Sequence, residues 1–193
     1  MKKICFLLVF LIFAIWAYPV EVKFMGGATL SKSTEPVLNR GEDPVRAVYG
    51  VGAVVGGGIE FTLTKNIAFE VDALYFQKGS RVEFLSGDEV LSRITKRLDE
   101  LSFPVLFKFR LKQGTSPYIL GGGELAIMFP EDANGIDYGL VCGIGFRKQM
   151  RSVSISLEGR YHHGLQDTRH EAPEPYVVIR KMRVFAFMVG LSI

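Results

Sequence analysis

The sequence predicts an all-β protein, an eight-stranded antiparallel up-and-down barrel that spans a membrane. Three observations indicate this fold. Apolar and polar residues alternate with a period of two along eight segments, as they do in strands with two different faces. Each segment reaches the roughly 9–11 residues that a tilted strand needs to cross a bilayer. The connections alternate between short turns and longer loops, which in such barrels lie on the periplasmic and the extracellular side.

The chain opens with the pattern of a secretory signal peptide, residues 1–17, followed by a single domain at 18–193. Lys2 and Lys3 precede an unbroken apolar run, Ile4 to Ala17. That run is shorter than the about 20 residues of a membrane-spanning helix, and it suits a signal peptide. An uncleaved N-terminal anchor is the alternative. The sequence therefore predicts export from the cytoplasm.

The composition argues against several classes of partner and stabilisation. Removing Lys2 and Lys3 lowers the formal charge from +3 to +1, which gives no indication of a nucleic-acid partner. Cys142 is the only cysteine after the predicted signal, so no intrachain disulfide is expected. Hydrophobic residues make up 48% of the chain, which is unusually apolar for a soluble all-β protein.

The first four expected strands are read between turn signals. The segment "VEVKFMGGATL" predicts a strand at about Val20–Leu30, and "YGVGAVVGGGIEFTL" predicts one at Tyr49–Leu63. After the short turn "TKN", the alternating stretch Asn66–Gly79 forms the third. The fourth, at about Ile94–Leu111, ends with "LSFPVLFKFRL".

The last four expected strands are separated by two more short turns. "KQGTS" leads into the fifth strand at Pro117–Phe129, and the sixth covers Asp137–Phe146. "KQMRS" leads into the seventh at Val153–His163, and the eighth covers Met182–Ile193. The longer connections cover about residues 31–48, 79–93, 130–136 and 164–181.

The two faces of these strands differ in chemical character. One face is apolar through the middle of nearly every strand and has aromatic residues toward the ends, like the aromatic girdles at membrane interfaces. If this face meets lipid, the opposite face lines the barrel. That face carries many glycines and a predicted lumen polar network of Lys23, Glu60, Glu70, Asp72, Lys78, Lys108, Arg110, Glu124, Asp137, Glu158 and Arg160.

The inward charges are interpreted as a plug. An eight-stranded barrel is just wide enough for its interior side chains to fill it. The inward acids and bases are similar in number, so they can pair, and a paired buried charge is far less costly than an isolated one. Glu70 and Asp72 are thus expected to belong to a polar plug, with room left by inward glycines such as Gly56, Gly58, Gly143 and Gly145. A cation-selective constriction is one alternative, and a soluble fold with the two faces inverted is another.

Two residues do not fit a regular barrel wall: one lacks a backbone donor for strand pairing, and the other puts a charge on the apolar outer face. Pro104 lies within the fourth strand and lacks a backbone donor, so a bulge or locally broken pairing is expected there. Arg183 has outward parity near the start of the eighth strand. We expect it near the lipid headgroups or in water.

The stretch "RYHHGLQDTRH" is the candidate for chemistry. Adjacent His162 and His163 point to opposite faces of a strand, so they cannot easily share a metal. We expect no metal, no cofactor and no catalytic residue. The rival hypothesis is a lipid A-modifying enzyme with inward His162 as base and Glu158 as acid, but no serine motif lies beside them. Cys142 has outward parity and is expected to be an inert thiol facing lipid.

The long segment "GSRVEFLSGDEVLSRITKRLDE" keeps some alternation on both arms. This pattern predicts that the third and fourth strands continue beyond the membrane as a hairpin. The exposed edges of such a hairpin offer a site for a protein partner. A surface loop without that role is the alternative.

Five segments fall in the order and spacing of a known family: "LTKNIAFEVDALYFQKG", "LDELSFPVLFKFRL", "SPYILGGGELAIMF", "DYGLVCGIGF" and "LEGRYHHGL". In these the chain resembles the PorT-like outer-membrane β-barrel family. The resemblance covers nearly all of residues 18–193 and implies an eight-stranded barrel in the outer membrane of a Gram-negative cell. It implies no activity, and the secretion role of the named member is not transferred. The chain departs from the family at Ile193, where an aromatic residue is usual, and this bears on recognition by the barrel-assembly machinery.

The sequence thus predicts a monomeric outer-membrane barrel with a plugged lumen and a structural or adhesive role. Its expected partners are outer-membrane lipid, the barrel-assembly machinery during insertion and a protein bound at the external loops, but no nucleic acid. A small-solute channel is the alternative, and the lipid A-modifying enzyme is less favoured.

Overall fold

The computed structural model of the 193-residue chain describes residues 19–33, 36–38, 45–86, 89–112, 114–129, 135–166, 177–179 and 181–193. Its strands are β1 (Val20–Ser33), β2 (Pro36–Leu38), β3 (Val45–Thr62), β4 (Ile67–Ser86), β5 (Glu89–Arg110), β6 (Ser116–Met128), β7 (Ile136–Met150), β8 (Val153–Gly164), β9 (Val177–Ile179) and β10 (Met182–Ser192). The predicted signal peptide, residues 1–17, lies outside the described residues.

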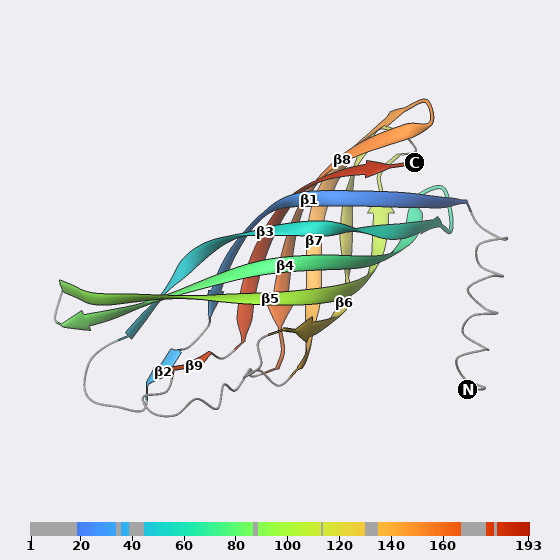
Figure 1. Ribbon diagram of the computed structural model, residues 1–193. Coiled ribbons are helices and arrows are strands. Elements are labelled where there is room, and N and C mark those ends of the chain that lie inside the picture. Colours follow the sequence, from blue (N-terminus) through green and yellow to red (C-terminus); the bar gives the residue numbers. More distant parts are fainter. Residues whose placement is uncertain are drawn as a thin grey trace, which may run out of the picture.

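Eight of these strands form a closed antiparallel barrel (Figure 1). The order around the wall is β1-β10-β8-β7-β6-β5-β4-β3, and β3 pairs back onto β1. The first and last barrel strands pair from Lys23 with Ser192 to Ser33 with Met182, so the wall has no free edge within the barrel. The predicted eight-stranded barrel is confirmed. The sequence analysis did not predict the separate two-stranded sheet of β2 and β9.

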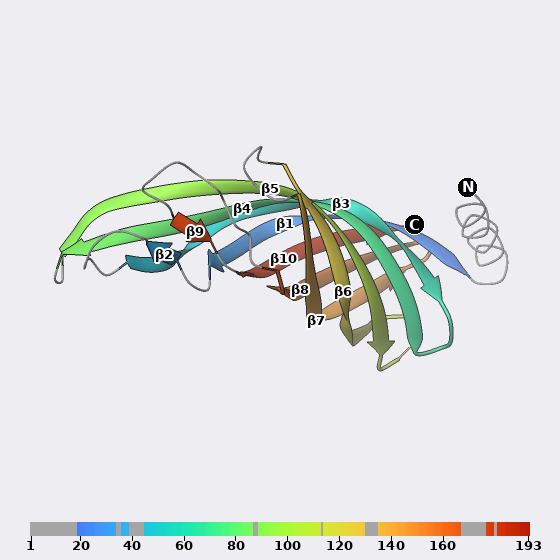
Figure 2. The same cartoon turned by 90° about the horizontal axis from the view of Figure 1, so that it is seen from below.

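The short turns that join β3 to β4, β5 to β6 and β7 to β8 gather at one end of the barrel (Figure 2). The short turns cover residues 63–66, 111–115 and 151–152. In the first, Thr64 Oγ1 accepts hydrogen bonds from the backbone N–H groups of Asn66 (3.3 Å) and Ile67 (3.0 Å). The short-turn end is the periplasmic side in outer-membrane barrels.

Pro104 interrupts pairing without a bulge. The β4–β5 ladder pairs Val71 with Val105 and Leu74 with Ser102, and leaves the two positions between them unpaired without a change of register. This agrees with the expected loss of a donor. The ladder is irregular elsewhere, between Tyr49 and Ala53 on β3 and between Phe84 and Leu85 on β4.

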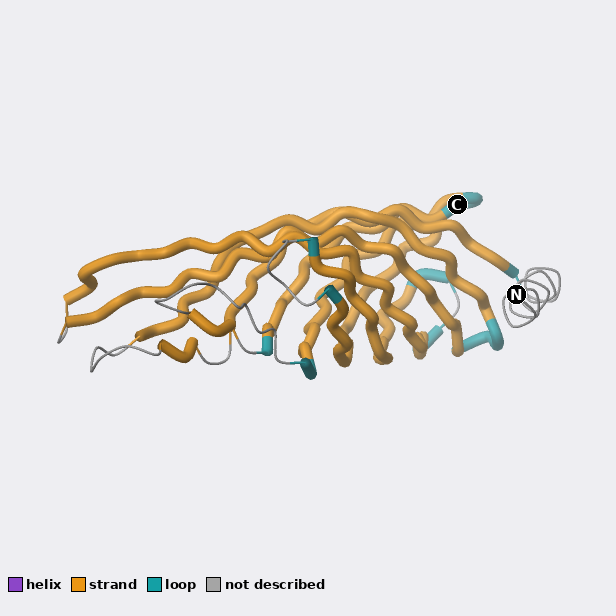
Figure 3. Tube along the Cα trace, turned by 60° about the horizontal axis from the view of Figure 1, so that its bottom comes forward, coloured by secondary structure: helices purple, strands orange, loops and turns teal. Residues whose placement is uncertain are grey.

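β4 and β5 continue beyond the barrel, and β3 accompanies β4 as far as Val45, which pairs with Phe84 (Figures 1 and 3). β4 and β5 stay paired from Lys78 with Leu98 outward to Ser86 with Glu89. The segment expected as a loop at 79–93 is therefore mostly strand, and the predicted projecting hairpin is present. Because β5 pairs with β6 only from Glu100 onward, the described part of β5 before Asp99 has a strand partner on one side alone, which is β4.

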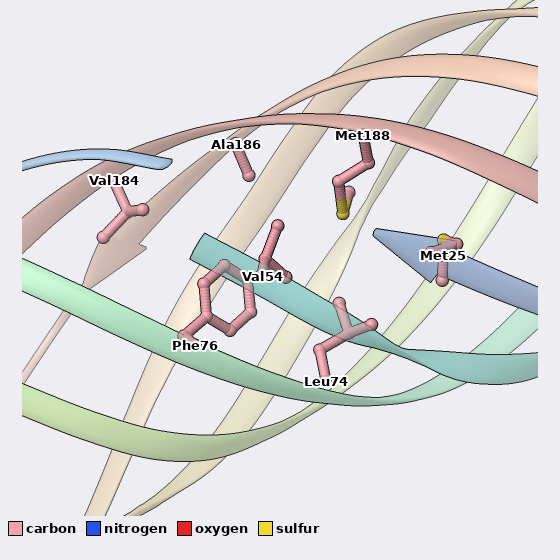
Figure 4. Packing of buried hydrophobic residues seen from close by; sticks show 7 residues of the cluster. All are labelled: Met25, Val54, Leu74, Phe76, Val184, Ala186 and Met188. Carbon is pink, nitrogen blue, oxygen red and sulfur yellow. The ribbon is translucent and has the colours of Figure 1, made fainter. Parts of the chain in front are cut away.

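The inward face contains an apolar cluster as well as charges. Seven inward side chains from β1, β3, β4 and β10 pack against one another (Figure 4): Met25, Val54, Leu74, Phe76, Val184, Ala186 and Met188. The sequence analysis did not predict this cluster. Among the described residues no helix is long and apolar enough to cross a membrane, a finding that concerns helices and not β-barrels.

We expect the projecting part of the hairpin to be dispensable for folding. Ser80 pairs with Lys96, so replacing residues 81–95 by an Asn-Gly turn joins two partners with a favoured two-residue loop. The shortened barrel should still insert and still migrate as a compact, heat-modifiable form on a gel. Loss of that form would show that the hairpin is part of the folding unit. The matched control replaces the same residues with a scrambled sequence of equal length that keeps the alternation.

Candidate functional site

A central cluster of six charged side chains fills the middle of the lumen. Its members are Lys23 on β1, Glu70 and Asp72 on β4, Lys108 on β5, and Glu158 and Arg160 on β8. All six are at most 4% exposed. Each has inward parity, because side chains alternate between lumen and lipid along a strand. With three carboxylates and three cations, the central cluster is neutral as a unit.

Arg160 connects the carboxylates of the central cluster. Its Nη1 lies 2.6 Å from Asp72 Oδ2, and its Nη2 lies 2.7 Å from Glu70 Oε1. Its Nε donates to Glu158 Oε2 at 2.7 Å. A planar guanidinium with five donors can serve three carboxylates in this way, whereas an ammonium group could not match the geometry.

The two lysines of the central cluster complete the pairing. Lys108 Nζ contacts Glu70 and lies 3.3 Å from Glu158 Oε1. Lys23 Nζ contacts Glu158 and lies 3.5 Å from Glu70 Oε2. Tyr118, which the sequence analysis did not include, donates its hydroxyl to Glu158 Oε1 at 2.5 Å. Glu70 and Glu158 therefore have several donors each, which is the condition under which a buried charge is tolerated. Asp72 is paired through Oδ2 with Arg160 alone, and its buried Oδ1 has no hydrogen-bond partner among the described residues.

A second group of ion pairs continues the network toward the short-turn end. Lys108 Nζ lies 3.0 Å from Glu60 Oε2, and Glu60 also pairs with Arg110. Arg147 Nη1 lies 3.3 Å from Glu60 Oε1, and its Nη2 lies 2.7 Å from Glu21 Oε2. Sequence analysis missed Arg147 because it ended that strand at Phe146. The alternation of faces could have identified it, because Arg147 lies two residues after the inward Gly145 and therefore has the same inward parity.

The remaining predicted network residues lie apart from this network. On β4, the apolar side chains Leu74 and Phe76 lie between Asp72 and Lys78. Beyond them Lys78 pairs with Glu100. The structure thus divides the eleven residues expected as one network into two groups separated by an apolar layer.

The group beyond the apolar layer, with Lys78 and Glu100, also contains the inward histidine. His162 Nδ1 lies 2.8 Å from Glu124 Oε2, and Ser102 Oγ donates to the same oxygen at 2.8 Å. Asp137 is also buried at this level and accepts hydrogen bonds from the backbone of Tyr138 and Gln166.

The arrangement at His162 differs from that of a hydrolase. The expected acid for His162 was Glu158, but the residue that contacts it is Glu124 on β6. Ser102 is bonded to the carboxylate rather than to the imidazole, so it lacks an adjacent base. His163 points outward, with Nδ1 3.2 Å from the Tyr161 hydroxyl. Among the described residues no group of three or more His, Cys, Asp or Glu could hold a metal ion.

Inward glycines leave room for side chains of the central cluster and for Tyr118, which is hydrogen-bonded to it. A Cβ on Gly58 would collide with the Asp72 carboxylate, and a Cβ on Gly145 would collide with the Tyr118 ring. Both collisions involve groups that bond to the central cluster. On the opposite face Cys142 is free and exposed, and Arg183 is exposed near the start of β10.

Residues 18–169 match the family model described as the outer membrane protein beta-barrel domain. The chain belongs to this family. It is an outer-membrane protein, and its apolar outer face therefore meets lipid. No curated protein is significantly similar to it in sequence.

Solved structures of other outer-membrane proteins share the fold. The outer membrane protein OprG from Pseudomonas aeruginosa is 15% identical, with 91% of this chain and 97% of that chain covered and a TM-score of 0.61. Neisserial surface protein A is 11% identical, with 90% and 96% covered and a TM-score of 0.56. AlkL, solved in lipid bilayers, is 16% identical, with 91% and 89% covered and a TM-score of 0.54. At these identities the likeness concerns the fold alone.

Replacing Arg160 should destabilise the barrel strongly. Arg160→Met leaves three buried carboxylates short of a partner, and breaking a buried ion pair in this way costs about 3–5 kcal/mol. The measurement is the fraction of compact form across a urea series in lipid vesicles. Arg160→Lys keeps the charge and should lose less. The exposed control Arg183→Gln should change stability by less than about 0.5 kcal/mol. Equal stability of the Arg160→Met and Arg183→Gln variants would contradict this account of the lumen.

Proposed function

We propose that this chain is a sealed, monomeric and non-enzymatic outer-membrane barrel with a structural or adhesive role, whose external hairpin binds a protein partner. The observation that carries this proposal is the occupation of the lumen by ion pairs that join opposite walls. In the barrel order β8 and β4 are four strands apart in either direction. Arg160 on β8 reaches Glu70 and Asp72 on β4, so the ion pairs cross the whole interior.

A second crossing lies nearer the short-turn end. Arg147 on β7 and Glu60 on β3 are likewise four strands apart, and they pair at 3.3 Å. On the other side of the central cluster the apolar cluster fills the space with Phe76, Met188 and their neighbours. Charged crossings at two levels and an apolar layer leave little room for a hydrated ion. These features favour the sealed barrel over the rival small-solute channel.

The external hairpin supports the interaction role. Beyond the barrel β5 pairs with β4 alone among the described residues, so its other edge offers unpaired backbone groups. An extended segment of a partner can add to such an edge through main-chain hydrogen bonds. The filled lumen and the projecting β-edge together support a role outside the cell over a role in transport.

The lipid A-modifying enzyme is less favoured on geometry. Its expected base, His162, is buried in the lumen and not directed at lipid. The nearby hydroxyl of Ser102 is bonded to Glu124, and an activated serine nucleophile needs a bond to the base instead.

We also propose a finer family assignment, to the PorT-like group. The support is the sequence resemblance, above all "LYFQKG" at 74–79 and "GRYHHGL" at 159–165. A secretion role is not part of the proposal. The barrel-assembly machinery is the expected partner during insertion.

Single-channel recording tests the sealed lumen. The wild-type barrel in planar bilayers should give little or no current. A matched variant with Lys23, Asp72, Glu158 and Arg160 all changed to alanine removes two acids and two bases, so the central crossing is opened while the net charge is kept. The Arg147–Glu60 pair and the apolar cluster remain. This variant, once shown to be compact on a gel, should conduct more than the wild type. Wild-type current steps as large as those of the variant would establish a channel.

Cross-linking on intact cells tests the hairpin. The wild-type barrel and the barrel with residues 81–95 replaced by an Asn-Gly turn are displayed at equal levels. The partner cross-linked to the wild type should be absent from the shortened barrel, because the extra β-edge is gone. A hairpin with a scrambled sequence and unchanged alternation separates main-chain from side-chain recognition. Capture of the same partners by the shortened barrel would refute the role of the hairpin.

A further inference from the structure

An apolar hollow lies on the outer surface of the barrel. Its volume is about 810 Å³, and it is lined by β5, β6, β7, β8 and β10. The outward side chains around it include Phe109, Ile119, Ile144, Leu157 and Phe187, each about half exposed or more. The volume is in the range of protein sites that hold small ligands.

A glycine opens the hollow. Gly159 on β8 has outward parity and lies between Ile144 on β7 and Phe187 on β10 in the ladder. A Cβ added there would meet nothing nearer than the Phe187 ring at 3.9 Å. The space outside Gly159 is therefore empty and flanked by larger side chains. The glycine is not required there by a close approach of another backbone segment.

The hollow lies in the half of the barrel next to the short turns. Phe109 and Leu111 line it at the end of β5, and Pro117 and Ile119 line it at the start of β6. Short turns mark the periplasmic side, so the hollow faces the acyl chains of the periplasmic leaflet.

Two exposed lysines follow lining residues of the hollow in the sequence, on the side of the short turns. Lys112 directly follows Leu111, and Lys148 follows the lining residue Phe146 by two positions, so it has the same outward parity. Among the rim residues at 19–22, 62–67, 110–112, 114–118, 147–154 and 191–193, Glu21 is the one acidic side chain, and it is paired with Arg147. The described part of the short-turn rim, which lies next to the hollow, therefore carries an excess of basic side chains.

We propose that the hollow binds an anionic glycerophospholipid of the periplasmic leaflet. One acyl chain lies in the hollow over Gly159, and the phosphate lies beside the ammonium groups of Lys112 and Lys148. The apolar lining selects a hydrocarbon chain, and the lysines select a negative headgroup at the depth where headgroups begin. Lipid A is also anionic and acylated, but it belongs to the other leaflet. The inference rests on the outer-membrane location and is independent of the role of the hairpin.

The test is native mass spectrometry of the barrel released from nanodiscs that contain equal amounts of phosphatidylglycerol and phosphatidylcholine with the same acyl chains. The wild type should retain phosphatidylglycerol preferentially. Each lysine near an anionic headgroup contributes roughly fivefold in affinity, so Lys112→Gln together with Lys148→Gln should lower the preference by roughly thirtyfold. Gly159→Leu should displace the acyl chain and lower retention of both lipids.

Matched controls separate this site from general membrane contact. Lys32→Gln removes an outward lysine near the opposite end of the barrel, where Lys32 lies over the Tyr49 ring. Gly123→Leu fills another exposed outward glycine, whose added Cβ would meet only a backbone oxygen at 3.7 Å. Both should leave retention unchanged. Equal retention of the two phospholipids by the wild type, an equal effect of Lys32→Gln, or preferred retention of lipid A would each overturn the proposal.

Discussion

The structure depends on ion pairs that join opposite walls of the barrel inside a medium that cannot solvate charge. Arg160 on β8 contacts Glu70 and Asp72 on β4, across the full width of the lumen. The same constraint closes the wall, because unpaired backbone groups in hydrocarbon cost several kcal/mol each. Charge is neutralised inside, backbone groups are satisfied within the wall, and the outer face can then be apolar.

The crossing side chains also explain where the inward glycines lie. The lumen of an eight-stranded barrel has room for long side chains only if the neighbouring inward positions carry small residues such as glycine. Gly58 leaves space for the Asp72 carboxylate, and Gly145 leaves space for the Tyr118 ring. The ion pairs and the inward glycines are thus one arrangement, so a larger side chain at either glycine would disturb the central cluster.

Sequence alternation predicted the wall and the inward direction of Glu70 and Asp72, because a period of two assigns a face to each residue. It could not predict partners, since these depend on the height that the strand stagger gives each residue. His162 illustrates the limit. The expected carboxylate, Glu158, lies on β8, the same strand as His162. The carboxylate that contacts His162 is that of Glu124 on β6, and β7 lies between these two strands. The sequence analysis did not predict the apolar cluster, because it considered charged residues and glycines on the inward face and not apolar ones such as Phe76.

The two edges of β5 are paired differently inside and outside the membrane. Within the membrane this strand has neighbours on both sides, and from Glu100 it pairs with β6. Before that point β4 is its neighbour and the other edge is open among the described residues. Outside the bilayer, water can form hydrogen bonds with unpaired backbone groups, whereas hydrocarbon cannot. An unpaired strand edge is therefore tolerated only outside the bilayer. The proposed partner, if it binds by backbone pairing, must therefore bind at the external end, while a ligand of the lipid-facing wall can be bound only through side-chain shape and charge.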